Sequence, residues 1–341
     1  MKSRIWVFTL CMLLVLSWAV AVPAADQKFK LRMGHYLAKG PFVAPEENFA
    51  KKIEERTNGR VTIDIAWANA LGKAEEVLTL AGRGAIDMGV AAPGYYANQL
   101  LFWKAFQMPY QFTTPGEAIR VLLKCYEAVP GYKEDMDKMG LIWLYQQPLG
   151  LYYITGKYTD GDKIENLKGK KIRSFGEYFP KSHMAIGAVP VNLFTTEIFE
   201  ALQRGVIDYS WLNAGNIHQY KLWEVGKYNY GPITCFSGHN ITIGKPTWNK
   251  LPKDIQDIFL DQAKKSQEEY IDFVDNYEAE SVKKIVAAGG VFKEFQPGEL
   301  DKWKKACPDY LAMWVKDCEG RGAGDQARKV AQIWKDMIGK K

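Results

Sequence analysis

The sequence lacks the short motifs that mark the commonest kinds of enzyme. No GxSxG, HExxH or GxxxxGK[ST] motif occurs in its 341 residues, and no cysteine and histidine stand in a recognisable catalytic setting. Gly82 and Gly84 lack the third glycine of a dinucleotide-binding fingerprint, and they precede an expected strand instead of following one. We therefore expect no enzymatic activity, no catalytic residue and no cofactor.

Metal-ligand spacing and basic patches are also missing. No CxxC pair occurs. The histidines stand singly, at His35, His183, His218 and His239. The formal net charge is only +6, and no block of lysine and arginine is interleaved with aromatic residues. We expect no metal site and no nucleic-acid partner.

Long apolar runs are absent except at the N-terminus. Residues 5–22 are almost wholly apolar, follow two basic residues and precede small residues before Asp26. This layout predicts a secretory signal peptide, residues 1–25, cleaved near Ala24-Ala25. A single membrane anchor is the alternative, because the run is about long enough to span a bilayer. The remaining chain is long enough for two domains.

Cysteine is rare in the expected mature chain. The cysteines of this mature chain are Cys125, Cys235, Cys307 and Cys318. An exported protein can oxidise some of its thiols. Cys307 and Cys318 are close in sequence and could bridge two ends of a helical segment, and four buried thiols are the alternative.

Strand and helix patterns alternate along the chain. We expect strands at residues 28–34, 61–67 and 86–91, with helices at 45–57 and 75–83. A second set follows, with strands at 170–174, 190–193 and 207–211 and helices at 178–186 and 196–204. This alternation predicts an α/β fold with mainly parallel pairing.

Two segments of the chain resemble each other. RGAIDMGV begins at Arg83 and RGVIDYSW begins at Arg204, an offset of 204 minus 83, or 121 residues. Each copy predicts a helix that ends at a glycine and turns into a strand, with the following aspartate capping or hydrogen-bonding the turn. We expect two lobes of similar build, and chance similarity is the alternative because the motif is short.

The C-terminal third is predicted to be helical. Residues 254–288 have helical spacing of apolar side chains, and such a helix would be about 50 Å long, enough to run across two lobes. A short strand at 291–295 and helices at 297–319 and 324–338 follow.

Motifs along most of the chain stand in the order and spacing of a known family. They are NLKGKKIR at 166–173, GAVP at 187–190, EIFEAL at 197–202 and GVID at 205–208. TNGR at 57–60, LG at 71–72, GAID at 84–87, MPYQF at 108–112 and WNKLP at 248–252 accompany them. The chain closely resembles the solute-binding proteins of TRAP (tripartite ATP-independent periplasmic) transporters, the DctP-like family.

The resemblance implies a fold and a function. The fold is a two-lobed periplasmic binding protein of the Venus-flytrap kind, type II-like, with the long helix spanning both lobes. Lobe one would hold residues 26–149 and part of 235–270, and lobe two 150–234 and part of 271–341. The protein would capture a small organic acid in the periplasm and deliver it to a membrane permease driven by an ion gradient. Presentation of the acid to a membrane sensor kinase is the alternative.

Arg173 is the first candidate for binding the ligand. It ends an expected strand, and its planar guanidinium can hold a carboxylate through two hydrogen bonds. The matching arginine of the family holds the acid group of the ligand, so the resemblance implies this role. An ordinary surface arginine is the alternative.

The sequence departs from the family in two places. Tyr152 stands where many members have a second arginine, and DYSWLN at 208–213 replaces the usual DGQEN. A ligand with one carboxylate or sulfonate group is therefore favoured over C4-dicarboxylates and sialic acid. Tyr152, Trp211 and Asn213 are expected to form an aromatic or hydroxyl-rich cage, with core packing as their alternative.

Further candidates follow the ends of expected strands, where doubly wound sheets bind ligands. From lobe one they are His35, Glu75 and Tyr95. Phe175 and Tyr178 could wall the ligand, and His239 is a weaker candidate. The alternative for Glu75 is an exposed carboxylate at the start of a helix. The alternative for His239 is a local hydrogen bond.

Overall fold

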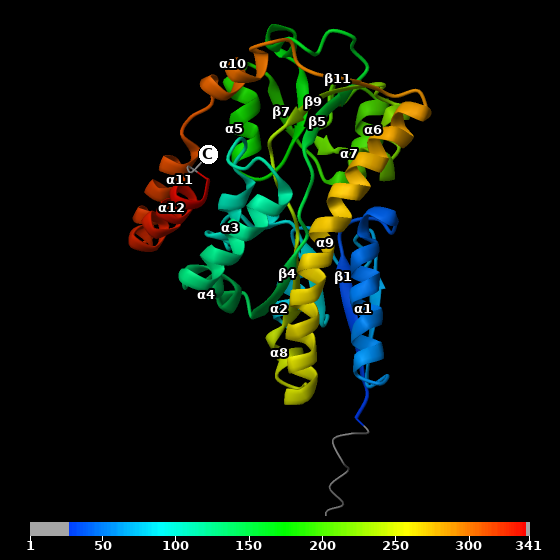
Figure 1. Cartoon of the computed structure of the whole chain (residues 1–341), viewed down its shortest axis with the longest axis vertical. Coiled ribbons are helices and arrows are strands. Elements are labelled where there is room, and N and C mark those ends of the chain that lie inside the picture. Colours follow the sequence, from blue (N-terminus) through cyan, green and yellow to red (C-terminus); the bar gives the residue numbers. More distant parts are fainter. Residues whose placement is uncertain (1–26, 339–341) are drawn as a thin grey trace, which may run out of the picture.

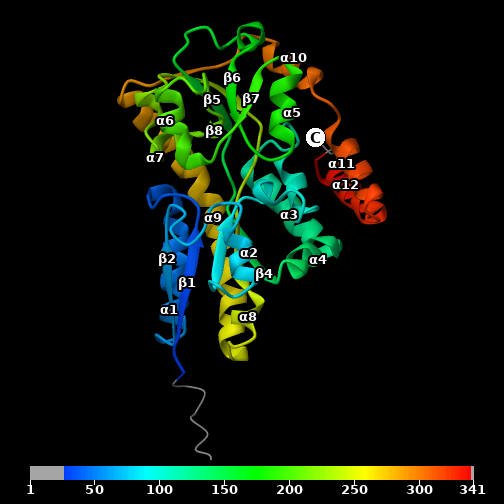
Figure 2. The ribbon, with the colours of Figure 1, turned by 180° about the vertical axis from the view of Figure 1, so that it is seen from behind.

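The structure is a computed structural model that describes residues 27–338 of the chain. The expected signal peptide at residues 1–25 lies outside the described residues. Within residues 27–338, no helix combines the length and the apolar character needed to cross a membrane. Two sheets with helices packed against them form two lobes, one above the other in Figures 1 and 2.

Lobe one is built on a five-stranded sheet in the order β2-β1-β3-β10-β4. Its strands are β1 (Phe29–His35), β2 (Val61–Ala66), β3 (Met88–Ala91), β4 (Leu141–Gln146) and β10 (Asn240–Gly244). β1 pairs parallel with β2 and β3, whereas β10 is antiparallel to β3 and β4. Helices α1 (Ala44–Arg56) and α2 (Val77–Gly82) connect the parallel strands, and α8 (Lys245–Trp248) follows β10. The carboxyl ends of β1 and β3 thus share one edge of the sheet.

Lobe two contains a four-stranded sheet in the order β11-β9-β5-β8 and a parallel pair, β6 and β7. The strands are β5 (Tyr152–Gly156), β6 (Lys171–Ser174), β7 (Val189–Asn192), β8 (Leu212–Asn213), β9 (Tyr228–Ile233) and β11 (Val291–Lys293). Its helices include α5 (Tyr178–Ala185), α6 (Ile198–Gln203) and α7 (Ala214–Gln219).

The strand expected at residues 207–211 is wrong. Only Tyr209 forms bridges there, to Gly156 on one side and Ile172 on the other. The backbone N–H groups of Asp208 and Tyr209 both donate to the carbonyl oxygen of Lys171. Because two consecutive residues share one acceptor, the regular ladder is interrupted, and pairing resumes only at β8.

The long helix is confirmed. α9 (Lys253–Ala287) has 35 residues and crosses from lobe one to lobe two in Figure 1. It contacts α1 and β4 of lobe one and α7 and β11 of lobe two. Its buried side chains include Ile255, Phe259, Tyr270, Val274 and Ile285, so one apolar face serves both lobes.

The C-terminal helices connect the two lobes a second time. The single helix expected at 297–319 is instead α10 (Glu299–Ala306) and α11 (Tyr310–Gly320), because Pro308 interrupts it, and α12 (Gly324–Ile338) follows. The indole of Trp303 on α10 donates to Ser182 on α5, whereas that of Trp314 on α11 donates to Leu101. α12 packs against α3 (Pro115–Ala128), near α4 (Gly131–Lys138) (Figure 1). The tryptophans of α11 and α12 are thus buried beside lobe one, and the division of 271–341 between the lobes stays a prediction.

The repeated segments form equivalent structures. α2 and α6 have six residues each and end before Gly84 and Gly205, at φ of 77° and 72°. The sequence suggested that the aspartates cap or hydrogen-bond the turn. In the structure they do not. Instead, Asp87 Oδ2 accepts the backbone N–H of Arg32 at 2.8 Å, and Asp208 Oδ2 accepts that of Lys171 at 2.7 Å. Each aspartate thus joins its repeat to a neighbouring strand, β1 in lobe one and β6 in lobe two.

Candidate ligand-binding site

Arg173 lies on β6 where lobe two faces lobe one, and its side chain is fully buried. Its Nε donates to the carbonyl oxygen of Leu193 at 3.0 Å, and its Nη1 to that of Trp211 at 3.4 Å. Its Nη2 donates to the hydroxyls of Tyr95 at 3.3 Å and Thr195 at 3.4 Å. Tyr95 comes from lobe one, so the guanidinium is held by oxygens of both lobes.

The charge of Arg173 is not balanced by these contacts. Its hydrogen-bond acceptors within residues 27–338 are two carbonyl groups and two hydroxyl groups, all uncharged. Burial and the charge of Arg173 together lower the pKa of neighbouring His183 to about 3. A buried cation is costly unless an anion pairs with it. The site therefore favours a bound anion.

Aromatic rings surround the guanidinium. The ring of Phe175 lies 4.4 Å from the guanidinium carbon, and Tyr95 packs against Phe175 with centroids 5.1 Å apart. Tyr152 packs against Trp211 at 5.8 Å. These rings make the surroundings of the charge apolar, while the tyrosines add hydroxyl groups.

An open depression lies between the lobes and shares the side chain of Tyr95 with the surroundings of this arginine. It is lined by Glu75, Gly94, Tyr95, Ala97, Asn98, Gln99, Gly176, Glu177, Lys181, Asn192, Phe194, Asp317 and Arg321. Tyr95 connects the two regions, because its ring lines the depression and its hydroxyl contacts Arg173. Glu75 is exposed and lines this depression.

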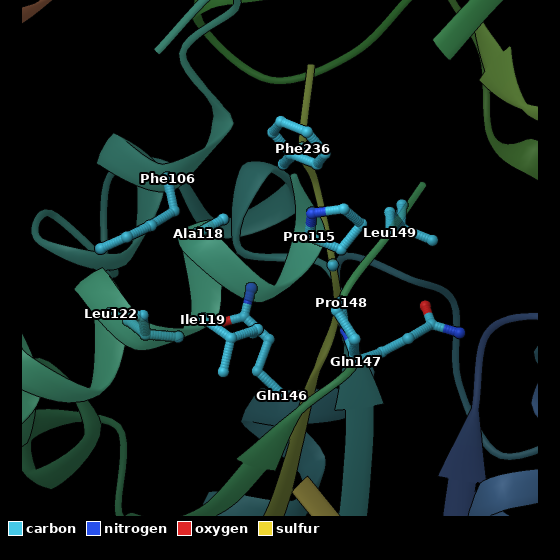
Figure 3. Close-up of a pocket in the computed structure, with 11 residues that line it drawn as sticks. Phe106, Pro115, Ala118, Ile119, Leu122, Gln146, Gln147, Pro148, Leu149 and Phe236 are labelled. Atoms are coloured by element: carbon cyan, nitrogen blue, oxygen red, sulfur yellow. The ribbon is translucent and has the colours of Figure 1, made fainter. Parts of the chain in front are cut away.

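A separate pocket lies where the chain crosses between the lobes (Figure 3). Helix α3 contributes Pro115, Ala118, Ile119 and Leu122, and the crossing segment contributes residues 146–149. Most of its lining is apolar, and it contains no charged residue and none of the predicted site residues. It therefore offers no partner for an acid group.

A buried polar cluster lies at the carboxyl end of β1. His239 Nε2 is 2.6 Å and His35 Nε2 is 3.6 Å from Oε1 of Glu46. The hydroxyl of Tyr270 donates to the same oxygen at 2.8 Å. Burial lowers the pKa of His35 to about 4, so its ring is neutral. Sequence spacing could not reveal this cluster, because its members come from four separate segments.

The cluster does not fit a metal ion. One ligand atom from each of His35, Glu46 and His239 lies within 4.8 Å of the others, which satisfies distance alone. However, Nδ1 of His35 accepts the backbone N–H of Leu37 at 3.0 Å. The proton of the neutral ring is therefore on Nε2, the atom facing Glu46, and that nitrogen has no lone pair for a metal.

Comparisons with known proteins show the family of the chain. The family described as "Bacterial extracellular solute-binding protein, family 7" matches residues 35–317. The chain belongs to this family. A C4-dicarboxylate-binding periplasmic protein, DctP, from Rhodobacter capsulatus is 27% identical over 85% of this chain and 87% of that protein.

Solved structures show the same fold. A Bordetella pertussis extracytoplasmic solute receptor that binds pyroglutamic acid superimposes with a TM-score of 0.82 at 18% identity, over 90% of this chain and 99% of that one. A TRAP periplasmic solute-binding protein from Haemophilus influenzae with bound L-gulonate gives 0.80 at 24% identity, over 90% and 100%. The two-lobed architecture expected of a TRAP solute-binding protein is thus confirmed.

Two of the predicted ligand residues of this family 7 protein have partners other than Arg173. The amide nitrogen of Asn213 donates to Glu278 on α9, and its oxygen accepts from Asn216 at 2.7 Å. Tyr178 packs against Tyr310 of α11, with centroids 5.7 Å apart. These side chains support the second lobe and its contact with the C-terminal helices.

Sequence reasoning missed two tyrosines. Tyr36 packs against Tyr95 with centroids 5.8 Å apart. No strand or helix pattern in the sequence marks Tyr220. Its hydroxyl nevertheless accepts the backbone N–H of Ala38 across the lobes at 3.0 Å. The position of Tyr36 directly after His35, at the end of an expected strand, was a signal that could have identified it.

The lobes of this solute-binding protein are joined by a cross-lobe clasp, which comprises Gln219 and Tyr220 of lobe two with Ala38 and Phe42 of lobe one. Gln219 Nε2 donates to the carbonyl oxygen of Ala38 at 2.9 Å, and its Oε1 accepts the N–H of Phe42 at 3.1 Å. The clasp places the loop after β1 against the end of α7.

Proposed function

We propose that this protein captures a small organic acid with one carboxylate or sulfonate group and delivers it to a TRAP-type membrane permease. The observation that carries the proposal is the fully buried guanidinium of Arg173, whose described partners are all uncharged. An anionic ligand would supply the missing charge and form charge-assisted hydrogen bonds.

Capture would proceed by closure of the lobes. The acid group first meets Arg173 on lobe two, and Tyr95 of lobe one then completes the site. The clasp between Gln219 and lobe one forms only when the lobes approach. Ligand would favour the closed form because both lobes contact it there.

A single acid group suits the charges of the site. Tyr152 is buried beside the aromatic cage where many family members have a second arginine, and it contributes a hydroxyl instead of a charge. The solved relatives from Bordetella pertussis and Haemophilus influenzae bind pyroglutamic acid and L-gulonate, each with one acid group. These ligands define the first compounds to test.

The experiment compares Arg173→Ala with Arg204→Ala. Arg204 also lies in lobe two, but its side chain is 72% exposed and pairs with Glu200 on the surface. After removal of co-purified ligand by unfolding and refolding, calorimetry with an organic-acid library should show binding by the wild type and by the Arg204 variant. Loss of Arg173 should cost about 2–5 kcal/mol of binding free energy. Unchanged affinity in the Arg173 variant would exclude this role.

Delivery needs a second measurement. Proteoliposomes that contain the cognate permease subunits should take up the acid only when the wild-type binding protein and an ion gradient are both present. Uptake without the binding protein, or binding without any stimulation of uptake, would contradict the transport part of the proposal.

A further inference from the structure

A buried network in lobe one reaches the ligand site through Tyr36. Oε1 of Glu46 accepts from Tyr270 at 2.8 Å and lies 2.6 Å from Nε2 of His239. On the other side of the same ring, Nδ1 of His239 lies 3.4 Å from the hydroxyl of Tyr36. Glu46, His239 and Tyr270 are fully buried, so this network is part of the interior and not of the surface.

Glu46 decides the hydrogen-bond roles in this network. Burial raises its pKa, but the hydrogen bond from His239 and the nearby ring of His35 outweigh burial and lower it to about 2. A carboxylate can only accept hydrogen bonds, so Nε2 of His239 carries a proton. In a neutral ring Nδ1 is then an acceptor. We take the ring of His239 as neutral, so that the hydroxyl of Tyr36 donates its proton to that nitrogen at 3.4 Å and keeps its oxygen lone pairs for another partner.

Tyr36 shares its surroundings with Arg173. Its ring packs edge-on against Tyr95, whose hydroxyl contacts the guanidinium. Burial raises the pKa of Tyr36 well above its usual value, Tyr95, Tyr152 and Tyr220 raise it further, and Arg173 opposes the shift. Tyr95 thus links the ring of Tyr36 to the charge that would hold the acid group.

We propose that Glu46 and His239 are positioning residues that present the Tyr36 oxygen as a hydrogen-bond acceptor, so that the site selects organic acids that also carry a hydroxyl or N–H donor. The inference rests on the proposed function, because Arg173 is taken to bind the acid group. A ligand without the donor would leave a buried oxygen without a partner. Sites built to bind a polar group reject analogues that lack it much more strongly than apolar pockets reject a missing methylene.

The first test uses two matched pairs of probes. Pyroglutamate is compared with N-methylpyroglutamate, which lacks the N–H, and gulonate with hexanoate, which lacks the hydroxyls. For at least one pair, calorimetry on the refolded wild type should show a preference of roughly ten- to hundredfold for the donor-bearing member. Tyr36→Phe, which removes only the hydroxyl, should reduce this preference to near one.

The positioning residues are tested by the same ratio. Glu46→Gln should also remove the preference, and so should His239→Phe, which keeps a ring but removes both nitrogens and with them the acceptor toward Tyr36. Glu47→Gln is the control, because Glu47 is the next carboxylate on α1 and pairs with Lys39 on the surface. A purely structural role would weaken both members of a pair equally and leave the ratio unchanged. That result would overturn the inference.

A second readout needs no ligand. Nitrogen-15 NMR of the histidine rings should show His239 protonated on Nε2 alone, and Glu46→Gln should alter this state while Glu47→Gln does not. A doubly protonated His239, or a proton on Nδ1, would overturn the inference. Equal binding within both pairs would overturn it as well and leave the proposed function intact. Failure of the whole organic-acid library to bind the wild type would overturn the proposed function itself.

Discussion

Lys104 and Glu177 form an ion pair at 2.8 Å between the two lobes. Lys104 belongs to the 3-10 helix Trp103–Gln107 beside lobe one, and only 2% of its side chain is exposed. Glu177 precedes α5 in lobe two. The same ammonium group also pairs with Asp317 on α11 at 2.8 Å. One buried cation thus holds a carboxylate from each side of the cleft.

The two carboxylates should have different roles. Glu177→Gln removes a contact between the two lobes, so we expect faster ligand dissociation and a loss of roughly 0.5–1.5 kcal/mol in binding, modest because Glu177 is partly exposed. Asp317→Asn should lower the free energy of unfolding and leave dissociation unchanged. Stopped-flow kinetics measures the rate of ligand dissociation, and urea denaturation measures the free energy of unfolding of each variant. Equal dissociation rates in both variants would contradict this division.

The clasp residue Gln219 should control how long the lobes stay closed. Gln219→Ala removes two hydrogen bonds to the loop of Ala38 and Phe42. Because each is worth about 0.5–1.5 kcal/mol, we expect binding to weaken by roughly 1–3 kcal/mol, mostly through faster dissociation. Exposed Gln203 at the end of α6 is the control. If ligand dissociates from the Gln219→Ala variant as slowly as from the Gln203→Ala variant, the clasp does not stabilise closure of the lobes.

Glu278 should make stability depend on pH. Burial raises the pKa of this carboxyl from 4.5 to about 7, although Asn213 and the N–H groups of Gly215 and Ala214 oppose the shift. Between these values the folded state binds more protons than the unfolded state, so stability falls as pH rises from about 4.5 to 7. Glu278→Gln should reduce this fall by about 1–2 kcal/mol, a discounted figure because the side chain is partly exposed.

Urea denaturation at pH values from 4.5 to 8 measures the effect. Exposed Glu280 supplies the control, Glu280→Gln. Burial also raises the pKa of Asp135 to about 7, so part of the slope should persist in the Glu278 variant. Identical pH profiles for wild type and Glu278→Gln would show that Glu278 titrates normally in the folded protein.

The paired aspartates should stabilise both lobes in the same way. Asp87 accepts from the backbone of Arg32 and from the hydroxyl of Thr247 at 2.7 Å. Asp208 likewise accepts from the backbone of Lys171 and from a hydroxyl group, that of Tyr158 at 2.6 Å. Either aspartate-to-asparagine variant should lose about 1–3 kcal/mol of unfolding free energy.

Asp64→Asn is the control for these two variants, because Asp64 is exposed on β2. Chemical denaturation provides the comparison. If the control loses as much stability as Asp87→Asn and Asp208→Asn, the strand contacts of the two aspartates contribute nothing specific.

Local sequence patterns predicted the helices and strands that are determined mainly by residues close together in the sequence. α9 was predictable because its apolar face repeats within one continuous segment, and β1, β2 and α1 because each has a clear period and end signals. β10 was missed because its pairing partners, β3 and β4, come from the first half of the chain. The strand expected at 207–211 had the right composition, but the sharing of one carbonyl group by two N–H groups depends on a neighbouring strand.

The residues of the site likewise divide into those with a local sequence signal and those whose contacts depend on the assembled fold. Arg173 was predicted because its motif is continuous in the sequence, and in the structure it lies buried on β6. The network of Tyr36, His239 and Glu46 could not be predicted in its contacts, because β1, β10 and α1 must first assemble. The bond of Asn213 to Glu278 likewise depends on where α9 passes lobe two.

The joint between α10 and α11 has a practical consequence for detecting ligand. All four cysteines of residues 27–338 are free thiols, and only Cys307 is not fully buried. It stands where the chain leaves lobe two and returns beside lobe one, 3.6 Å from Ser182. A fluorophore coupled to this native thiol would sit at the junction of the two lobes, so lobe closure on ligand would change its surroundings and the wild-type protein could serve as its own optical sensor without an engineered attachment point.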